Sequence, residues 1–107
     1  MKGAGLLNRR VMLEEPVRNA DASGGAAVSW KQTARLWAHI KPLSGRERLQ
    51  HEKTTSRVTH EVAIRYRKGL SPAMRFNDGG RVYAIHTVLD PDQTRCWHHC
   101  RCSEVQL

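Results

Sequence analysis

The sequence predicts a mainly β fold, a small antiparallel β-barrel with a long inter-strand loop. Apolar and polar side chains alternate with a period of two through most of the 107 residues, which is typical of strands. Clusters of Gly, Asn, Asp and Pro separate these segments. About six antiparallel strands in one small domain cannot leave bare edges. We therefore expect a single domain, residues 1–107, that curls into a barrel or compact sandwich, and favour the barrel.

The first strand is predicted around Val11 and Leu13, which alternate with side chains on the opposite face. Pro16 either ends this strand or confines it to a sheet edge, because proline has no N–H for a central ladder. The small residues and two glycines of 19–25 favour a turn.

A second strand, long or broken, is predicted over residues 28–40. Aromatic and β-branched side chains pack well on a pleated surface. We therefore expect Trp30, Trp37 and Ile40 to anchor this strand in the core.

The alternation returns after residue 57. One face of the next strand carries Val58, His60, Val62, Ile64 and Tyr66. A short strand is expected at 74–76, a hairpin turn at 77–80, a strand at 81–89 and a last strand at 94–105. On the 81–89 strand, Tyr83, Ile85, Thr87 and Leu89 share one face.

The alternation is interrupted between Ser44 and Arg57. Ser44 and Glu47 have the spacing of a capping box, which favours a turn or two of helix. Leu49 is the one strongly apolar residue in the segment, so a helix there has no face to bury. Most connections between strands are short, and long ones are often functional or disordered. We therefore predict a long loop over 44–57; its basic residues are Arg46, Arg48, Lys53 and Arg57.

The chain is basic, with 18 Lys and Arg against 10 Asp and Glu and a formal net charge of +8. The excess is spread along the chain, unlike the block of a nucleic-acid-binding tail. It favours proximity to DNA, RNA or an acidic protein face, or simply keeps the surface solvated. We expect synthesis in the cytoplasm and no membrane partner, because no signal-peptide core or membrane-length apolar run is present in the sequence.

No enzymatic motif stands out in the sequence. The ten acidic residues fall mostly in predicted turns or on exposed strand faces, and no pair suggests an acid/base dyad. The sequence has neither a phosphate-binding glycine loop nor a helical metal-binding His pair. We expect a non-enzymatic protein without a cofactor.

The last strand contains the densest group of reactive side chains. Cys96, His98, Cys100 and Cys102 would share one face, and thiolate with imidazole is a good zinc ligand set. Four ligands along one straight strand spread over roughly 20 Å, so they cannot meet one ion. Two of them could still converge with His60 or His86. The favoured interpretation is that the cysteines act as small hydrophobic residues, with a zinc-stabilised interaction domain as an alternative.

A small basic nucleic-acid-binding β-barrel is a second alternative. Such a barrel stacks bases on exposed aromatic side chains of a basic sheet face. Trp37, Tyr66 and Tyr83 instead fall at positions that a barrel core would take. Basic loops that contact phosphate remain compatible with the sequence.

The order of segments along nearly the whole chain resembles a known family. The segments are 7–11, the Gly-Gly turn with Trp30, 37–47, 59–67, 74–76, 80–85 and 102–104. Together they resemble the phage head-tail joining (head-closure, or stopper) proteins of long-tailed bacteriophages and gene transfer agents. The Cys/His-rich last strand departs from the family pattern.

This resemblance implies a structural role at the head-tail interface of a virion or phage-like particle. Family members are small β-barrels that form rings, and a hexamer or a dodecamer is compatible with the family. The implied partners are a portal-side adaptor protein, a tail terminator or tail completion protein, and packaged double-stranded DNA in the channel. The long loop would face that channel, with Arg46, Arg48, Lys53 and Arg57 as its cationic residues.

Overall fold

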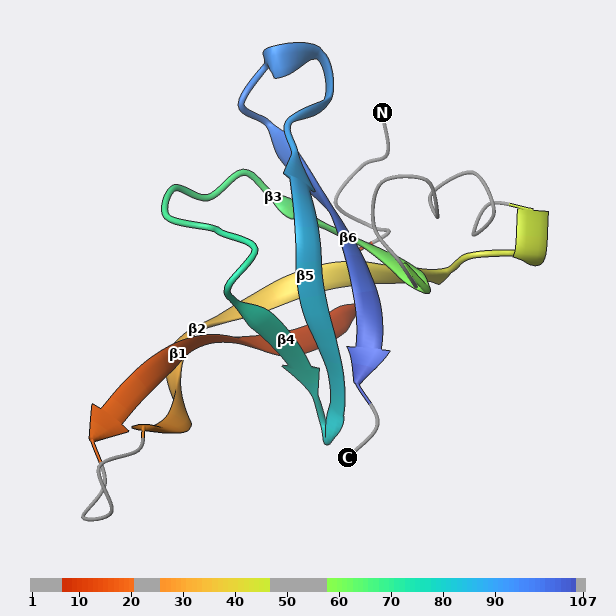
Figure 1. Cartoon of the computed structure of the whole chain (residues 1–107). Helices are drawn as coiled ribbons and strands as arrows, with labels where there is room; N and C mark the ends of the chain where they lie inside the picture. The colour runs from red at the N-terminus through yellow and green to blue at the C-terminus, as the bar shows by residue number, and fades with distance from the viewer. Residues whose placement is uncertain (1–6, 21–25, 47–57, 106–107) are drawn as a thin grey trace.

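Six antiparallel strands close into one barrel in the order β1-β2-β3-β6-β5-β4 (Figure 1). The computed structural model describes residues 7–20, 26–46 and 58–105. The barrel that the sequence predicts is thereby confirmed. The strands are β1 (Arg9–Ala20), β2 (Ala26–Pro42), β3 (His60–Arg65), β4 (Arg75–Asp78), β5 (Arg81–Leu89) and β6 (Trp97–Val105).

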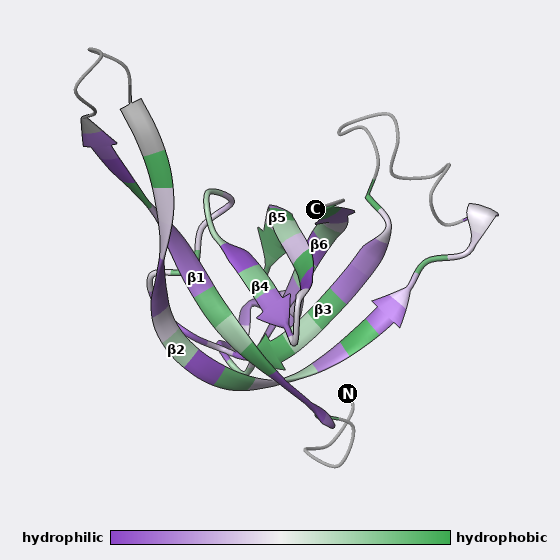
Figure 2. Ribbon diagram, turned by 90° about the horizontal axis from the view of Figure 1, so that it is seen from below, coloured by the Kyte–Doolittle hydropathy of each residue, from purple (hydrophilic) through white to green (hydrophobic). Residues whose placement is uncertain are grey.

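β1 and β2 form a long hairpin whose far end projects from the barrel (Figures 1 and 2). The second strand is one continuous element of 17 residues, not a broken one. Its ladder with β1 shifts register where Leu13 pairs with Ala34 and Glu14 with Gln32, which leaves Thr33 as a bulge. Pro16 lies beyond the part of β1 that pairs with β4, so the edge position predicted for it is confirmed.

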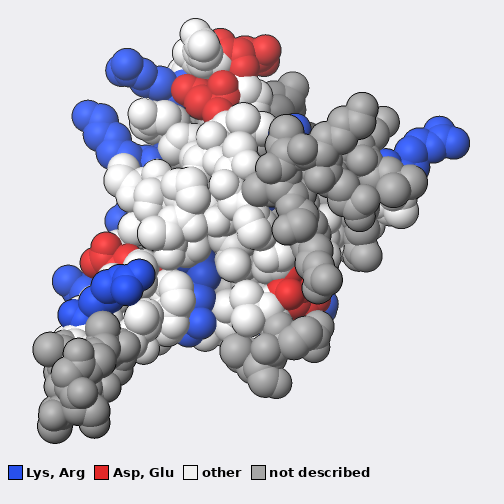
Figure 3. Space-filling model, viewed as in Figure 1, with Lys and Arg blue, Asp and Glu red and all other residues white. Residues whose placement is uncertain are grey.

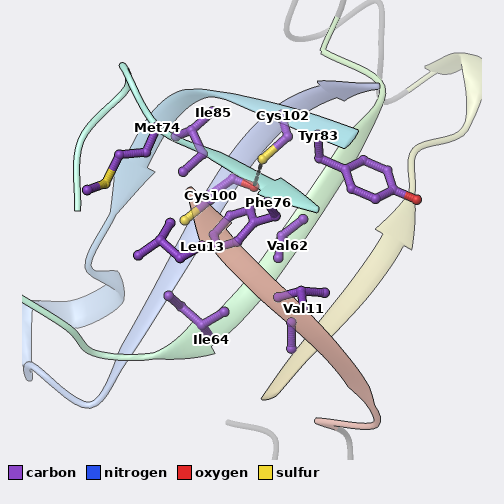
Figure 4. Close-up of a cluster of buried hydrophobic side chains, with 11 residues drawn as sticks. Val11, Leu13, Val62, Ile64, Met74, Phe76, Tyr83, Ile85, Cys100 and Cys102 are labelled. Carbon is purple, nitrogen blue, oxygen red and sulfur yellow. Dashed lines mark hydrogen bonds between the residues drawn. The ribbon is translucent and has the colours of Figure 1, made fainter. Parts of the chain in front are cut away.

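Alternate residues of the strands point into the barrel and form its apolar core (Figure 4). The predicted face of β3 is confirmed, since Val58, His60, Val62 and Ile64 are all buried. Tyr66 is only partly buried, because it follows the end of β3. The core cluster comprises Val11, Leu13, Ala38, Val62, Ile64, Met74, Phe76, Tyr83, Ile85, Cys100 and Cys102.

The prediction that Trp37 anchors the core is wrong, because its side chain is 50% exposed. The pleat of β2 directs Leu36, Ala38 and Ile40 toward the core and Trp37 toward the outside. Ile40 does pack against the core, as predicted.

The hairpin turn between β4 and β5 follows the prediction from Asn77-Asp78-Gly79-Gly80. Gly79 and Gly80 have φ values of 60° and 105°, which a primed turn requires. The Asn77 side-chain oxygen accepts a hydrogen bond of 2.9 Å from the Gly80 N–H.

β5 has the predicted bounds, but its alternation is broken by a second bulge. Ile85 pairs with Cys102 and Thr87 with Arg101, which leaves His86 unpaired in the ladder. Because of this shift, Val88 packs against the core. The expectation that Thr87 and Leu89 share one face with Tyr83 and Ile85 is therefore wrong.

The barrel is closed by a short ladder of three residue pairs between β1 and β4. Beside this ladder, Arg75 Nε donates a 2.7 Å hydrogen bond to Glu14 Oε1. The Glu14 side chain is only 6% exposed and that of Arg75 18%. The Arg75 guanidinium also lies 4.0 Å from the centre of the Trp30 ring, a cation–π contact. Glu14, Arg75 and Trp30, named here the closure cluster, thus join β4 to both strands of the projecting hairpin.

Glu14→Ala is expected to destabilise the barrel by about 3 kcal/mol, because it leaves the Arg75 charge buried without its carboxylate. Glu15→Ala is the matched control. Glu15 lies 3.9 Å from the largely exposed Lys31, and such a pair contributes less than about 1 kcal/mol. Urea unfolding of the two variants measures the difference, and equal midpoints would contradict the importance assigned to the closure cluster.

Candidate functional site

The long loop leaves the barrel from an anchored base. The last residue pair between β2 and β3 is Pro42 with His60, and the Leu43 N–H then donates a 2.9 Å hydrogen bond to the Thr59 carbonyl. Leu43 and Val58 are 6% and 1% exposed. We call residues 42–44 and 58–60 the loop base. The Leu43 and Val58 side chains are buried and the backbone beside them is paired, so the chain has fixed positions at residues 43 and 58.

Thr59 ties this loop base to β6 as well. Its N–H donates to the Cys102 carbonyl at 2.8 Å, and its hydroxyl oxygen accepts the Glu104 N–H at 2.9 Å. The same hydroxyl lies 2.8 Å from His60 Nδ1. The loop base is therefore held by β2, β3 and β6 together.

Arg46 is the one predicted loop cation within the described residues. Its side chain is exposed, and Gly45 and Arg46 are helical, at the point where the capping-box spacing predicts a helix to begin; Glu47 lies outside the described residues. Arg48, Lys53 and Arg57 lie outside the described residues. The assignment of these four residues to a DNA channel stays a prediction.

The four candidate metal ligands Cys96, His98, Cys100 and Cys102 do not form a metal cluster. His98, Cys100 and Cys102 lie on the inner face of β6, whereas Cys96 precedes the strand and is exposed. Burial raises the pKa of Cys100 to about 12 and that of Cys102 well above its usual value, with a further contribution from Glu61. Neutral buried thiols of this kind pack as small apolar groups.

The histidines each contact a different neighbour. His98 packs its ring against Tyr66, with centroids 4.5 Å apart, and burial lowers its pKa. His60 meets Tyr83 edge-on at 4.9 Å, and His86 Nε2 lies 2.7 Å from the Ser103 hydroxyl. Among the residues in 7–20, 26–46 and 58–105, no three His, Cys, Asp or Glu side chains could hold a metal ion. The zinc alternative therefore has no ligand set in this part of the chain.

The outer face of the barrel combines aromatic rings with arginines. The guanidinium carbon of Arg10 lies 4.9 Å from the Trp37 ring centre, and that of Arg65 lies 5.2 Å from the Trp97 ring centre. Only Tyr83 of the three aromatic residues predicted for the core is fully buried. The parity of Leu36, Ala38 and Ile40 is the sequence signal that identifies Trp37 as an outer-face residue.

The basic charge is distributed, as the sequence predicts. Figure 3 shows Lys and Arg at several separate places on one face, with Asp and Glu beside some of them. Arg81 donates two 2.9 Å hydrogen bonds to Glu104, which lowers the pKa of that carboxyl, and Arg9 pairs with Asp78. No helix in the described part of the chain is long and apolar enough to cross a membrane.

The sequence of this barrel matches a known protein family over nearly its whole length. The family model for the phage head completion protein matches residues 3–105. The chain belongs to this family. Members are structural, non-enzymatic proteins of the phage head, and the protein is a component of the virion. The resemblance drawn from the sequence is thereby confirmed.

Two solved structures are similar to this phage head completion protein. Protein SF1141 from Shigella flexneri 2a, a solution structure, is 25% identical with a TM-score of 0.76, and the match covers 96% of each chain. A chain from the virion of a native gene transfer agent particle is 28% identical with a TM-score of 0.66, covering 92% of this chain and 94% of that one. The comparison with curated proteins found no match.

The burial of two cysteines predicts selective thiol chemistry. Cys96 should react with a thiol reagent in the folded protein, whereas Cys100 and Cys102 should react only after unfolding, because they are buried and neutral. Counting labelled thiols by mass spectrometry, with and without denaturant, checks this. Rapid labelling of all three in the native state would contradict the placement of β6 in the core.

The same two thiols predict a loss of stability in alkali. The ordinary thiol pKa is 9.0 and the folded value for Cys100 is about 12, so over this interval the unfolded chain releases a proton that the folded chain keeps. The contribution is complete below pH 9.0 and disappears as the pH rises toward 12. Each thiol contributes at most about 1.4 kcal/mol per pH unit.

The free energy of unfolding of the wild type should therefore fall more between about pH 8 and about pH 10 than that of Cys100→Ala/Cys102→Ala. Tyr83, whose pKa burial also raises, is present in both proteins and cancels in this comparison. Parallel pH dependences would contradict the prediction.

Proposed function

We propose that the protein is a ring-forming head-tail connector that also helps to retain packaged DNA. In this function, six or twelve copies form a closed ring between a portal-side adaptor protein and a tail terminator or tail completion protein. The 44–57 segment of each copy faces the channel that contains the packaged double-stranded DNA. Membership of the phage head completion family and the likeness to a chain of a gene transfer agent virion support this proposal.

The anchored loop base is the structural observation that carries the proposal. A loop that resists DNA movement must transmit force to a rigid support, and the loop base is paired with β2, β3 and β6. A loop free to move at its base could not do this. The buried Leu43 and Val58 further fix the two points where the segment leaves the barrel.

The charge of the loop favours DNA as its neighbour. Residues 44–57 carry four Lys or Arg and two Glu, which is a net charge of +2 for each copy. Ring symmetry repeats this charge around one axis, so the field in the channel is much larger than that of a monomer. Phosphates on duplex DNA are attracted by such a ring of cations.

The exposed Trp37 on a basic outer face favours a second function, a free nucleic-acid-binding barrel. The two functions differ in the oligomeric state of the active protein. A connector acts as a ring inside the particle, whereas a free binder holds nucleic acid as a monomer with a steep salt dependence.

Deletion of the gene and complementation test the proposal. Wild-type protein should restore tailed, DNA-filled particles. Arg46→Ser/Arg48→Ser/Lys53→Ser should restore the head-tail junction but lower DNA retention, because the substitutions remove positive charge from the loop and leave the strands of the barrel unchanged. Particle images measure the junction, and encapsidated DNA per particle measures retention.

A variant with three exposed cations removed elsewhere, Arg18→Ser/Lys31→Ser/Lys68→Ser, is the matched control and should retain DNA like the wild type. If DNA retention fell equally in both variants, the loop cations would have no special role in it. The connector function would be wrong if tailed particles formed intact without the protein. If the isolated monomer then also bound DNA tightly, the protein would be a free nucleic-acid binder.

A further inference from the structure

A groove opens where the β2 and β3 strands separate. The β2–β3 ladder ends with Ala38 and Ile64, and the chain after Arg65 turns away to pair with residues before β6. β2 continues past this point toward the hairpin tip (Figure 2). The space between the two chains has a volume of about 480 Å³, within the range of ligand sites. We call it the β2–β3 groove.

One wall of the groove is a free strand edge. Residues 35–37 of β2 pair with residues 10–12 of β1 on one side. On the other side, no strand among the described residues pairs with them. In an antiparallel strand, alternate residues direct their N–H and C=O groups to each side, so this edge presents backbone groups that an extended chain could bond.

The groove is apolar at its floor and basic at its rim. Leu36 and Ile64 contribute apolar surface, and the half-exposed Trp37 and partly buried Tyr66 contribute aromatic rings. Apolar and aromatic walls of this kind accept alternate side chains of an extended peptide.

Three arginines, Arg35, Arg65 and Arg67, also line the groove, and none of its described lining residues is acidic. No carboxylate of the described chain forms an ion pair with Arg35 or Arg67. This contrasts with Arg75 and Arg81, which each bind a glutamate. Within the described residues, the groove therefore has positive charge without a paired carboxylate beside a free strand edge.

We propose that the β2–β3 groove binds an extended, carboxylate-rich segment of a neighbouring virion protein, which adds as a short strand to the free edge of β2. Main-chain hydrogen bonds to β2 supply affinity, apolar side chains of the segment enter between Trp37 and Tyr66, and its carboxylates pair with Arg35 and Arg67. A second copy of this chain is a poorer occupant, because no six-residue stretch of its sequence carries more than two Asp or Glu. The choice of a virion protein as the occupant rests on the proposed function, which places this chain beside other virion proteins.

Binding to the isolated protein tests the groove without particles. The probe is a labelled peptide of about six residues, ~20 Å when extended, in which Val alternates with Asp or Glu. We expect saturable binding by fluorescence anisotropy, weakened by salt. Arg35→Ser/Arg67→Ser should weaken binding about tenfold or more. Arg18→Ser/Lys31→Ser loses the same charge on the projecting hairpin and should bind like the wild type.

Two N-methylated peptides separate strand addition from simple charge attraction. Only alternate residues of an added strand donate hydrogen bonds to the edge. One peptide is methylated on the odd amides and the other on the even amides. We expect one of them to lose binding and the other to keep it, whereas equal binding by both would overturn strand addition.

Other outcomes also overturn the inference. If a peptide with Lys in place of each Asp or Glu bound equally well, recognition of charge would be excluded. A single-stranded oligonucleotide of equal charge that binds more tightly at the same arginines would make the groove a nucleic-acid site. Concentration-dependent dimerisation lost in Arg35→Ser/Arg67→Ser would make a second copy the occupant. Peptide binding and ring formation in particles are measured separately, so either can fail while the other holds.

Discussion

The closure of the barrel depends on one short contact, the three-pair ladder between β1 and β4. The buried Glu14–Arg75 pair and the Trp30 ring over Arg75 reinforce it. Breaking a buried ion pair costs about 3–5 kcal/mol, a large part of the 5–15 kcal/mol that stabilises a typical domain. The exposed Glu15–Lys31 pair contributes much less to the free energy of unfolding.

Closure also determines which surfaces are left for assembly. Because β1 meets β4 over only three pairs, the far part of the long hairpin projects beyond the barrel. The β2–β3 ladder ends at Ala38, which leaves one edge of residues 35–37 free. The opposite end of β2 is pinned to β3 and β6 at the loop base. One strand, β2, thus carries both the anchored loop and the groove. A ligand in the groove and DNA at the loop would act on the same rigid element.

The sequence predicts features that depend on neighbouring residues. The Asn77–Gly80 turn, the bounds of β5 and the inner face of β3 follow from local turn chemistry and alternation. The facing of Trp37 also follows from the alternation, since Leu36, Ala38 and Ile40 have the opposite parity, but the aromatic ring favoured a core position. The bulge at His86 and the groove do not follow from the local sequence, because they arise from ladder register between distant strands. The interpretation of the cysteines as small apolar residues is correct for Cys100 and Cys102 but not for the exposed Cys96, because β6 begins only at Trp97.

An image of the intact particle at side-chain resolution would show where this chain lies and how its copies are arranged. We expect a closed ring of this chain at the head-tail junction, with the 44–57 segment of every copy directed toward the axis and its DNA. A ring whose 44–57 segments face outward, or copies placed elsewhere in the particle, would contradict it.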